Sequence, residues 1–129
     1  MSTYLDASAA LKLVFVEAES KALFKFVGTS PMFASSALIR TELLRAAKRL
    51  DTRHTGRALE FLGSVTLREI DDEILDRAAE ILPVSIRTLD AIHVATATLL
   101  APDLDVVISY DRRMIEAARL YGLPVASPA

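Results

Sequence analysis

The chain has 129 residues, of which 52% are hydrophobic and 25% charged, the size and composition of one globular domain spanning residues 1–129. It contains no cysteine, which excludes disulfides, thiolate zinc sites and a cysteine nucleophile and agrees with a reducing cytoplasm. Its net charge of -2 excludes a globally basic nucleic-acid binder, so any contact with nucleic acid must be local.

Two further absences bear on location. The longest apolar stretch, residues 91–101, is shorter than the ~18 residues that a membrane span needs. The residues before Asp6 lack the charged and apolar regions of a secretory signal. We therefore expect a soluble, cytoplasmic protein without a membrane partner.

Along the chain, short apolar runs alternate with longer segments of helical period, which predicts βαβ units. Five strands are expected, at 3–5, 32–35, 65–69, 106–109 and 124–126. Between them helices are expected at 9–17, 20–27, 37–50, 55–62, 72–82, 89–100 and 112–121. The fold class is α/β, a three-layer α/β/α sandwich around a mostly parallel five-stranded sheet. Helix N-caps are expected at Ser8, Ser36, Thr88 and Asp111.

Four acids could meet at one edge of this sheet. Asp6 closes the first strand and Asp111 follows the fourth, so both belong at the carboxyl edge, where open α/β folds bind ligands. Asp90, in the first turn of its helix, and Glu42, in the helix after the second strand, could face the same edge. Such acids repel one another unless a divalent cation is bound, and oxygen-only ligands suit Mg²⁺ or Mn²⁺. A site of this kind can hydrolyse a phosphodiester.

Each acid also has a purely structural interpretation, which periodicity alone leaves open. Asp111 can be only an N-cap, and Asp90 only a favourable charge at a helix N-terminus. Glu42 can be a solvated ion-pair partner of Arg45, three residues on. Asp6 is harder to explain in this way, because a charged residue directly after a short apolar strand is unusual for a structural site.

Three sequence segments resemble motifs of the PIN domain family, and in particular of its VapC-type toxins. The segment from Tyr4 to Ala9, YLDASA, resembles the opening motif, in which an aspartate ends the first strand. Residues 87–97, RTLDAIHVATA, closely resemble the third acidic motif, and residues 108–113, ISYDRR, the fourth. Glu42 occupies the place of the family's helical glutamate, so the resemblance covers essentially the whole chain.

The resemblance implies a metal-dependent endoribonuclease, the toxin of a type II toxin-antitoxin pair, which cleaves RNA to a 3′-hydroxyl and a 5′-phosphate and so arrests translation. By carry-over Asp6, Glu42, Asp90 and Asp111 are the catalytic and metal-binding acids, and Ser8 and Ser109 orient ligands or water. It further implies a homodimer and a cognate antitoxin whose tail lies beside the active site. Relatives often carry an aromatic residue where this chain has Met114, which puts the local packing in doubt, and His93 is expected to pack against the sheet.

Two other features have functional and structural interpretations. Arg45, Arg49 and Arg53 belong to a basic run at four-residue spacing that could hold RNA phosphates or form a solvated face. Apolar residues of the first two helical segments could line a dimer or antitoxin groove, although plain core is the favoured interpretation; they are Val14, Phe15, Phe24 and Phe26.

The alternative functions are non-catalytic: a receiver-like regulatory module, or a PIN fold kept only for binding. A receiver needs paired acids after its first strand, whereas Asp6 has no acidic neighbour. The haloacid dehalogenase motif needs an aspartate two residues after the first, where Ser8 stands. A binding-only PIN domain would normally have lost acids, and none of the four is missing.

Overall fold

The computed structural model describes residues 1–29 and 31–129. Their centre is a sheet of five strands in the order β3-β2-β1-β4-β5, with every neighbouring pair parallel. The strands are β1 Ser2–Leu5, β2 Phe33–Ser36, β3 Val65–Arg68, β4 Leu104–Ile108 and β5 Val125–Ala126. The predicted α/β sandwich with a parallel five-stranded sheet is confirmed. A receiver-like order, 2-1-3-4-5, is not the one found.

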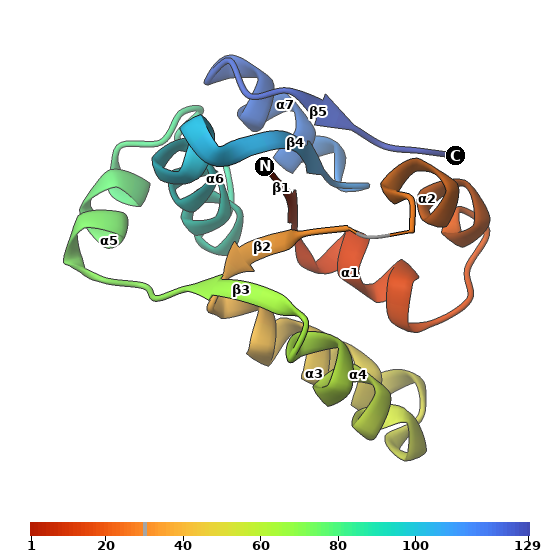
Figure 1. The fold of residues 1–129 in the computed structure, drawn as a ribbon. Coiled ribbons are helices and arrows are strands. Elements are labelled where there is room, and N and C mark those ends of the chain that lie inside the picture. The colour runs from red at the N-terminus through yellow and green to blue at the C-terminus, as the bar shows by residue number, and fades with distance from the viewer. Residues whose placement is uncertain (30) are drawn as a thin grey trace.

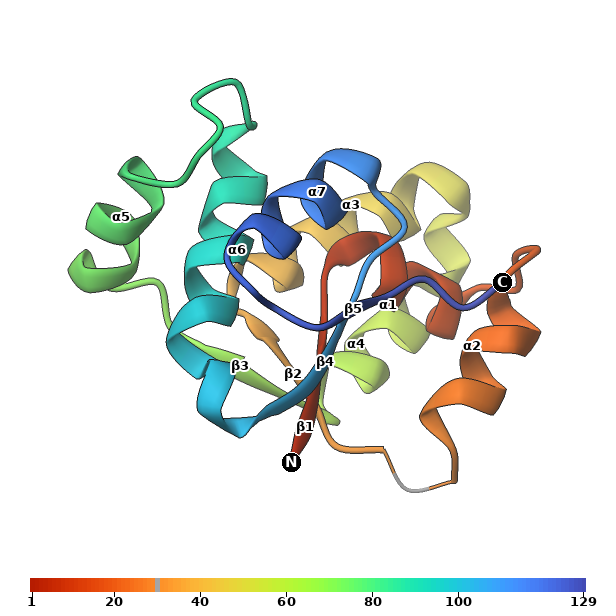
Figure 2. The same ribbon diagram turned by 90° about the horizontal axis from the view of Figure 1, so that it is seen from above.

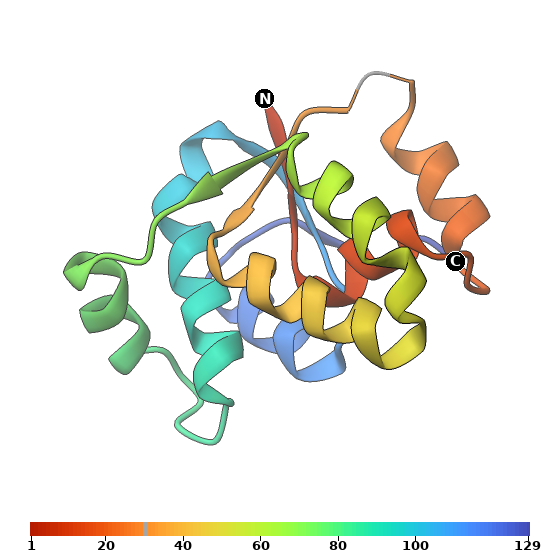
Figure 3. The same ribbon diagram turned by 90° about the horizontal axis from the view of Figure 1, so that it is seen from below.

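Seven α-helices connect the described strands. Helices α5 and α6 lie on one side of the sheet, and α1, α3 and α4 lie together on the other (Figures 1 and 3). Each side has its own apolar core, because a parallel sheet must be covered on both faces. The helices are α1 Ala7–Val14, α2 Ser20–Val27, α3 Leu38–Leu50, α4 Thr55–Leu62, α5 Asp72–Ala79, α6 Thr88–Leu100 and α7 Arg112–Leu120.

Helix α6 is the most enclosed element of the fold. All seven residues from Ala91 to Ala97 are buried, so this helix has no solvent-facing stripe in its centre. The sheet covers one side of it, and α5 and α7 pack along the others. A helix enclosed in this way is apolar almost all round, as a helix inside a core must be. Its exposed N-terminal turn carries Asp90, which is thereby held in a fixed place beside the sheet.

Several predicted helix starts were wrong. Ser8 does not cap α1, because the Asp6 carboxylate accepts the Ala9 N–H and starts the helix two residues earlier than expected. Ser36 lies one residue before the cap position of α3, although its hydroxyl accepts the Leu38 N–H. Thr88 is the first residue of α6 rather than its cap, and no side chain caps that helix. Asp111 does cap α7, as expected.

Two predicted helix ends were also too late. Helix α1 stops at Val14 rather than at residue 17, because the Ser20 hydroxyl donates to the Lys12 and Phe15 carbonyls and accepts the Glu17 N–H. Helix α5 stops at Ala79 rather than at residue 82. After Ala79 the chain forms tight turns in which the Ile81 side chain is buried. Pro83 follows, and a proline cannot continue a helix interior.

The apolar residues of the first two helices have different surroundings. Val14 is buried and Phe15 packs against the same core cluster, as plain core would predict. Phe24 and Phe26 of α2 are instead 53% and 51% exposed, so the favoured interpretation was wrong for both. Met114 is fully buried against α6, which removes the doubt about packing at this position. No helix among the described residues combines the length and apolarity needed to cross a membrane.

A candidate acidic active site

The two strands that end in site residues are neighbours in the middle of the sheet. Strand β1 runs beside β4 (Figure 2). In this pair Tyr4 lies opposite Val107 and Leu5 opposite Ile108. Parallel strands in register end at the same edge, so the turn after each strand is brought against the other. This adjacency places Asp6 beside Ser109 although 103 residues separate them in the chain.

Asp6 is the most deeply held of the four acids, with an exposed fraction of 5%. Its Oδ1 accepts hydrogen bonds from the Ser8 hydroxyl at 2.6 Å and from the Ala9 N–H at 3.0 Å. Its Oδ2 accepts one from the Ser109 hydroxyl at 2.5 Å. Burial raises the pKa of Asp6, and the hydrogen bonds from Ser109 and Ser8 oppose that rise because they favour the ionised carboxylate.

The hydroxyls of Ser8 and Ser109 each link the turn after β4 to the Asp6 carboxylate. The Ser8 oxygen accepts the Tyr110 N–H at 2.9 Å, and the Ser109 oxygen accepts the Asp111 N–H at 3.1 Å. Each hydroxyl therefore accepts from the turn after β4 and donates to the carboxylate after β1. Together they tie these two turns into one unit, a geometry that suits the orienting role expected of them.

Asp90 and Asp111 belong to the starts of α6 and α7. Asp111 caps α7, where its Oδ1 accepts the Arg113 N–H at 2.9 Å, as one structural interpretation required. Asp90 is half-buried, and burial raises its pKa first, followed by the like charges of Asp111, Asp6 and Glu42. All three neighbours thus lie near enough to disfavour a further negative charge. Asp111 therefore caps α7 and also contributes negative charge near Asp90.

Glu42 reaches the cluster from α3. Its Oε1 lies 2.6 Å from Nε2 of His93, and no ion pair with Arg45 is found in the described part of the chain, contrary to the structural alternative. His93 is 1% exposed, and its Nδ1 lies 2.7 Å from the Tyr4 hydroxyl. It packs against the sheet as expected, with its ring edge-on to that of Tyr4. The links to Tyr4 and Glu42 were not predicted, since no local spacing joins residues on β1, α3 and α6.

A divalent cation suits the chemistry of this donor set. All four acids offer oxygen ligands, and no lysine or arginine pairs with Asp6, Asp90 or Asp111 within residues 1–29 and 31–129. No three acidic or histidine side chains in those ranges stand in a ready-made metal cage. Mg²⁺ is commonly held by one or two carboxylates and several waters, so a complete cage is not required.

A groove lies between α1 and α3, with Glu42 among its lining residues. Its volume is about 470 Å³, and one wall carries Arg45 and Arg49. Arg53 does not line it; its guanidinium pairs with Asp51 at 2.8 Å. Among the acids, Glu42 lines the groove; the other lining residues are Ala7, Ser8, Leu11, Leu38, Thr41, Ala46 and Leu89.

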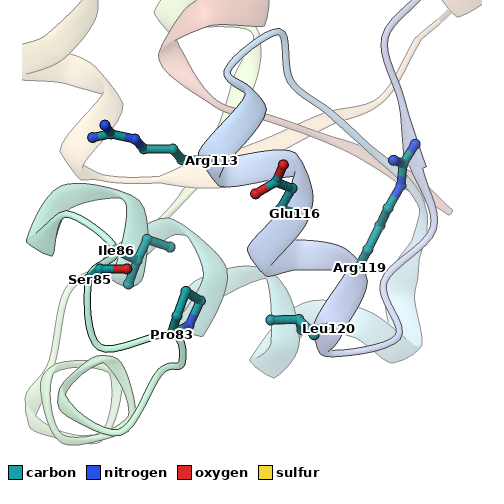
Figure 4. Close-up of a pocket in the computed structure, with 7 residues that line it drawn as sticks. All are labelled: Pro83, Ser85, Ile86, Arg113, Glu116, Arg119 and Leu120. Atoms are coloured by element: carbon teal, nitrogen blue, oxygen red, sulfur yellow. The ribbon is translucent and has the colours of Figure 1, made fainter.

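A larger pocket, of about 740 Å³, lies between α7 and the loop that precedes α6 (Figure 4). None of the four acids lines it. Pro83 and Ile86 come from the loop, and Leu120 faces them from the end of α7. The larger pocket is therefore not the site that the chemistry favours. The acidic edge is the candidate site, because Asp6 and Asp90, whose pKa values are raised, both lie there.

Comparison with known families agrees with this geometry. The family model described as "PIN domain" matches residues 3–120. The chain belongs to the PIN domain family.

Within that family the chain is similar to curated VapC ribonucleases of Mycobacterium tuberculosis. It is 43% identical to Ribonuclease VapC46 of strain ATCC 25618 / H37Rv over 128 residues, which covers 98% of this chain and 97% of that protein. It is 36% identical to Ribonuclease VapC35 of the same strain over 130 residues, which covers 97% and 96% of the two chains. The chain therefore matches VapC-type ribonucleases over nearly their full length.

Solved structures share the fold at lower sequence identity. Mycobacterium tuberculosis VapC20, described as a toxin that cleaves the sarcin-ricin loop, aligns with a TM-score of 0.75 and 16% identity over 98% of this chain and 100% of that one. A toxin-antitoxin complex from Klebsiella pneumoniae aligns with a TM-score of 0.72 and 21% identity, covering 99% and 98%. At these identities the likeness concerns the fold alone.

Proposed function

We propose that this protein is a metal-dependent endoribonuclease and the toxin of a toxin-antitoxin pair, which hydrolyses RNA phosphodiester bonds and thereby arrests translation. The observation that carries the proposal is the pairing of β1 with β4, which brings the turns that hold Asp6 and Asp111 to one edge of a PIN-type sheet. The charges of Asp111, Asp6 and Glu42, which raise the pKa of Asp90, support the inclusion of all four acids. The names of the curated relatives, ribonucleases aligned over nearly the whole chain, support the choice of RNA as substrate.

In this proposal the four acids hold Mg²⁺ or Mn²⁺, which supplies a Lewis acid and lowers the pKa of bound water. Ser8 and Ser109 hold the Asp6 carboxylate in one orientation, and their hydrogen bonds oppose the rise in its pKa that burial causes. Asp90 and Asp111 extend from the starts of two helices whose positions the core determines. The residues thus provide a preorganised anionic edge, which reduces the reorganisation needed during reaction.

Cleavage of total cellular RNA by the purified protein tests the proposal. We expect cuts in Mg²⁺ or Mn²⁺ and none in EDTA, with 3′-hydroxyl and 5′-phosphate ends when the termini are sequenced. Metal-independent cuts would remove the metal from the mechanism. Absence of cleavage with every metal, across RNA from several growth conditions, would favour the alternative of a binding module.

Metal binding is expected to stabilise the folded protein. Carboxylates that repel one another in the native state gain more from a cation than they do when separated in the unfolded chain. At a free metal concentration ten times the Kd, linkage predicts about 1.4 kcal/mol of stabilisation, a rise of roughly 4–6 °C in Tm for a domain of this size. The difference in Tm between thermal unfolding in Mn²⁺ and in EDTA measures this stabilisation. An unchanged Tm at metal concentrations that support cleavage contradicts the cluster.

Arg45 and Arg49 are proposed to hold RNA phosphates along the groove. Replacing both with alanine should weaken RNA binding, and the slope of log K against log salt should fall by roughly 1–2, because each phosphate contact contributes nearly one unit. Binding to a fluorescent RNA across a salt series measures the slope. Arg53→Ala is the matched control, since Arg53 pairs with Asp51 outside the groove. Equal slopes in all three proteins would assign the groove arginines to a solvated face.

We further propose a cognate antitoxin and a homodimer as the protein's partners. A toxin-antitoxin complex is among the structures that share the fold, which supports the antitoxin. The groove beside Glu42 offers an apolar floor for its tail. Light scattering of the pure protein tests the dimer: a monomer mass throughout the micromolar range rejects it.

A further inference from the structure

A chain of two hydrogen bonds leads from the centre of the sheet to the acidic site. It begins at the Tyr4 hydroxyl on β1, passes through the imidazole of His93 on α6, and ends at the Glu42 carboxylate on α3. The two distances are 2.7 and 2.6 Å. Tyr4 and His93 are 0% and 1% exposed, whereas the Glu42 side chain is 20% exposed. The chain therefore joins an inaccessible anchor to an accessible acid.

The protons along this chain can be assigned from its chemistry. Burial raises the pKa of Tyr4, so its hydroxyl keeps its proton. If that proton is donated to Nδ1 of a neutral His93, the other ring nitrogen must carry the ring proton and donate to Glu42. The opposite tautomer would set the Nε2 lone pair against a carboxylate oxygen at 2.6 Å, which is repulsive. A doubly protonated ring would also donate from Nε2, so the bond to Glu42 has the same direction in either case.

The four acids differ in how they are held. Asp6 accepts three hydrogen bonds from its own turn and the neighbouring one, and Asp111 accepts one from the backbone of the helix that it caps. Glu42 is the fifth residue of α3, and in the described part of the chain no backbone N–H donates to its side chain. Among the described residues, the hydrogen-bond partner of the Glu42 carboxylate is His93. Without this partner, the flexible Glu42 side chain would have to lose its rotamer freedom when it binds a ligand, which costs free energy.

We infer that His93, anchored by Tyr4, is a positioning residue that holds the Glu42 carboxylate in one orientation for metal and substrate. It acts through Glu42 and has no contact with the reacting atoms. The inference rests on the proposed function, in which Glu42 is one of the metal-binding acids. Outer residues that orient metal-binding side chains typically contribute 10- to 100-fold in metal affinity or activity.

The test measures Mn²⁺ affinity by calorimetry and RNA cleavage in parallel. His93→Leu cannot donate a hydrogen bond to Glu42, so it should bind Mn²⁺ roughly 10- to 100-fold more weakly. Its kcat for RNA cleavage should fall, whereas its KM for RNA should stay near the wild-type value. His93→Gln, whose amide can donate near the position of Nε2, should recover part of both. Native circular dichroism establishes that each variant is folded. If His93→Leu does not fold, Tyr4→Phe, which removes the anchor of His93, carries the comparison, and wild-type Mn²⁺ affinity and kcat in that variant overturn the inference.

A double-mutant cycle separates positioning from general stability. In a Glu42→Gln background, His93→Leu should change Mn²⁺ affinity by less than about twofold, because the residue through which it acts is already altered. The same loss in both backgrounds overturns the inference, as does unchanged affinity in folded His93→Leu. If the wild type neither binds Mn²⁺ nor cleaves RNA, the proposed function itself fails, and the positioning role fails with it.

Nitrogen-15 NMR of the metal-free wild-type protein provides a readout that is independent of activity. Nε2 of the His93 ring should carry a proton and donate it to the Glu42 carboxylate. A proton on Nδ1 alone overturns the assignment whatever the enzyme's activity. Tyr4→Phe should keep a proton on Nε2, because Glu42 still accepts it, and should keep the fold, because the aromatic ring that packs on His93 remains.

Discussion

Asp90→Asn is expected to lose at least ~100-fold in RNA cleavage while unfolding at no lower temperature than the wild type. Asparagine has nearly the same shape but no negative charge, so it cannot serve as an anionic ligand. Burial and the charges of Asp111, Asp6 and Glu42 raise the pKa of Asp90, which means that its ionised form is disfavoured in the folded protein. Removing that charge relieves a cost instead of creating one.

Cleavage rates and thermal unfolding in EDTA measure the two halves of this prediction. Asp72→Asn is the matched control, because Asp72 also lies in the first turn of a helix but far from the cluster in the chain. It should cleave at the wild-type rate. Retained activity in Asp90→Asn would remove this residue from the mechanism, and a fall in Tm by several degrees would contradict its unfavourable charge.

Met114→Ala is expected to cost about 2–5 kcal/mol of unfolding free energy, the largest stability effect that we predict. Met114 is fully buried and joins α7 to the core cluster around α6. Truncation removes apolar contacts and leaves a cavity between the helices that begin near Asp111 and Asp90. Urea unfolding at constant pH measures the change.

Met114→Leu serves as the control, since a volume-conserving substitution in a core usually costs less than about 1.5 kcal/mol. A small change in Met114→Ala would mean that the neighbouring side chains collapse into the vacated space. Equal losses in the two variants would instead show that the position tolerates only the unbranched thioether.

The local sequence was sufficient for most of the fold. Short β-branched runs such as residues 106–108 and helices with one apolar stripe depend on neighbours within a few positions, so their periods could be recognised directly. Strand and helix limits mostly shifted by one or two residues. The larger errors were the ends of α1 and α5, each predicted three residues too late. Beyond α1 the Ser20 hydroxyl satisfies backbone groups outside the helical pattern, and beyond α5 the chain turns and buries Ile81.

The four acids could be named from the sequence because each stands at a recognisable point of a strand, a helix or a family motif. That Asp6 lies beside Ser109 required the pairing of β1 with β4, which the sequence only allowed. The partner of Glu42 could not be predicted, since the local pattern pointed to Arg45 on the same helix and the structure brings in His93 from 51 residues away.

The sequence by itself determined which residues are apolar, which acids are present and where strands and helices alternate, because these depend on side-chain chemistry and local periodicity. Only the tertiary structure decided how the acids are held. Ser8 and Ser109 fix Asp6, and His93 and Tyr4 fix Glu42, through hydrogen bonds between segments distant in the chain. Such bonds form only after the sheet order and the burial of α6 have brought those segments together, and no local preference encodes them.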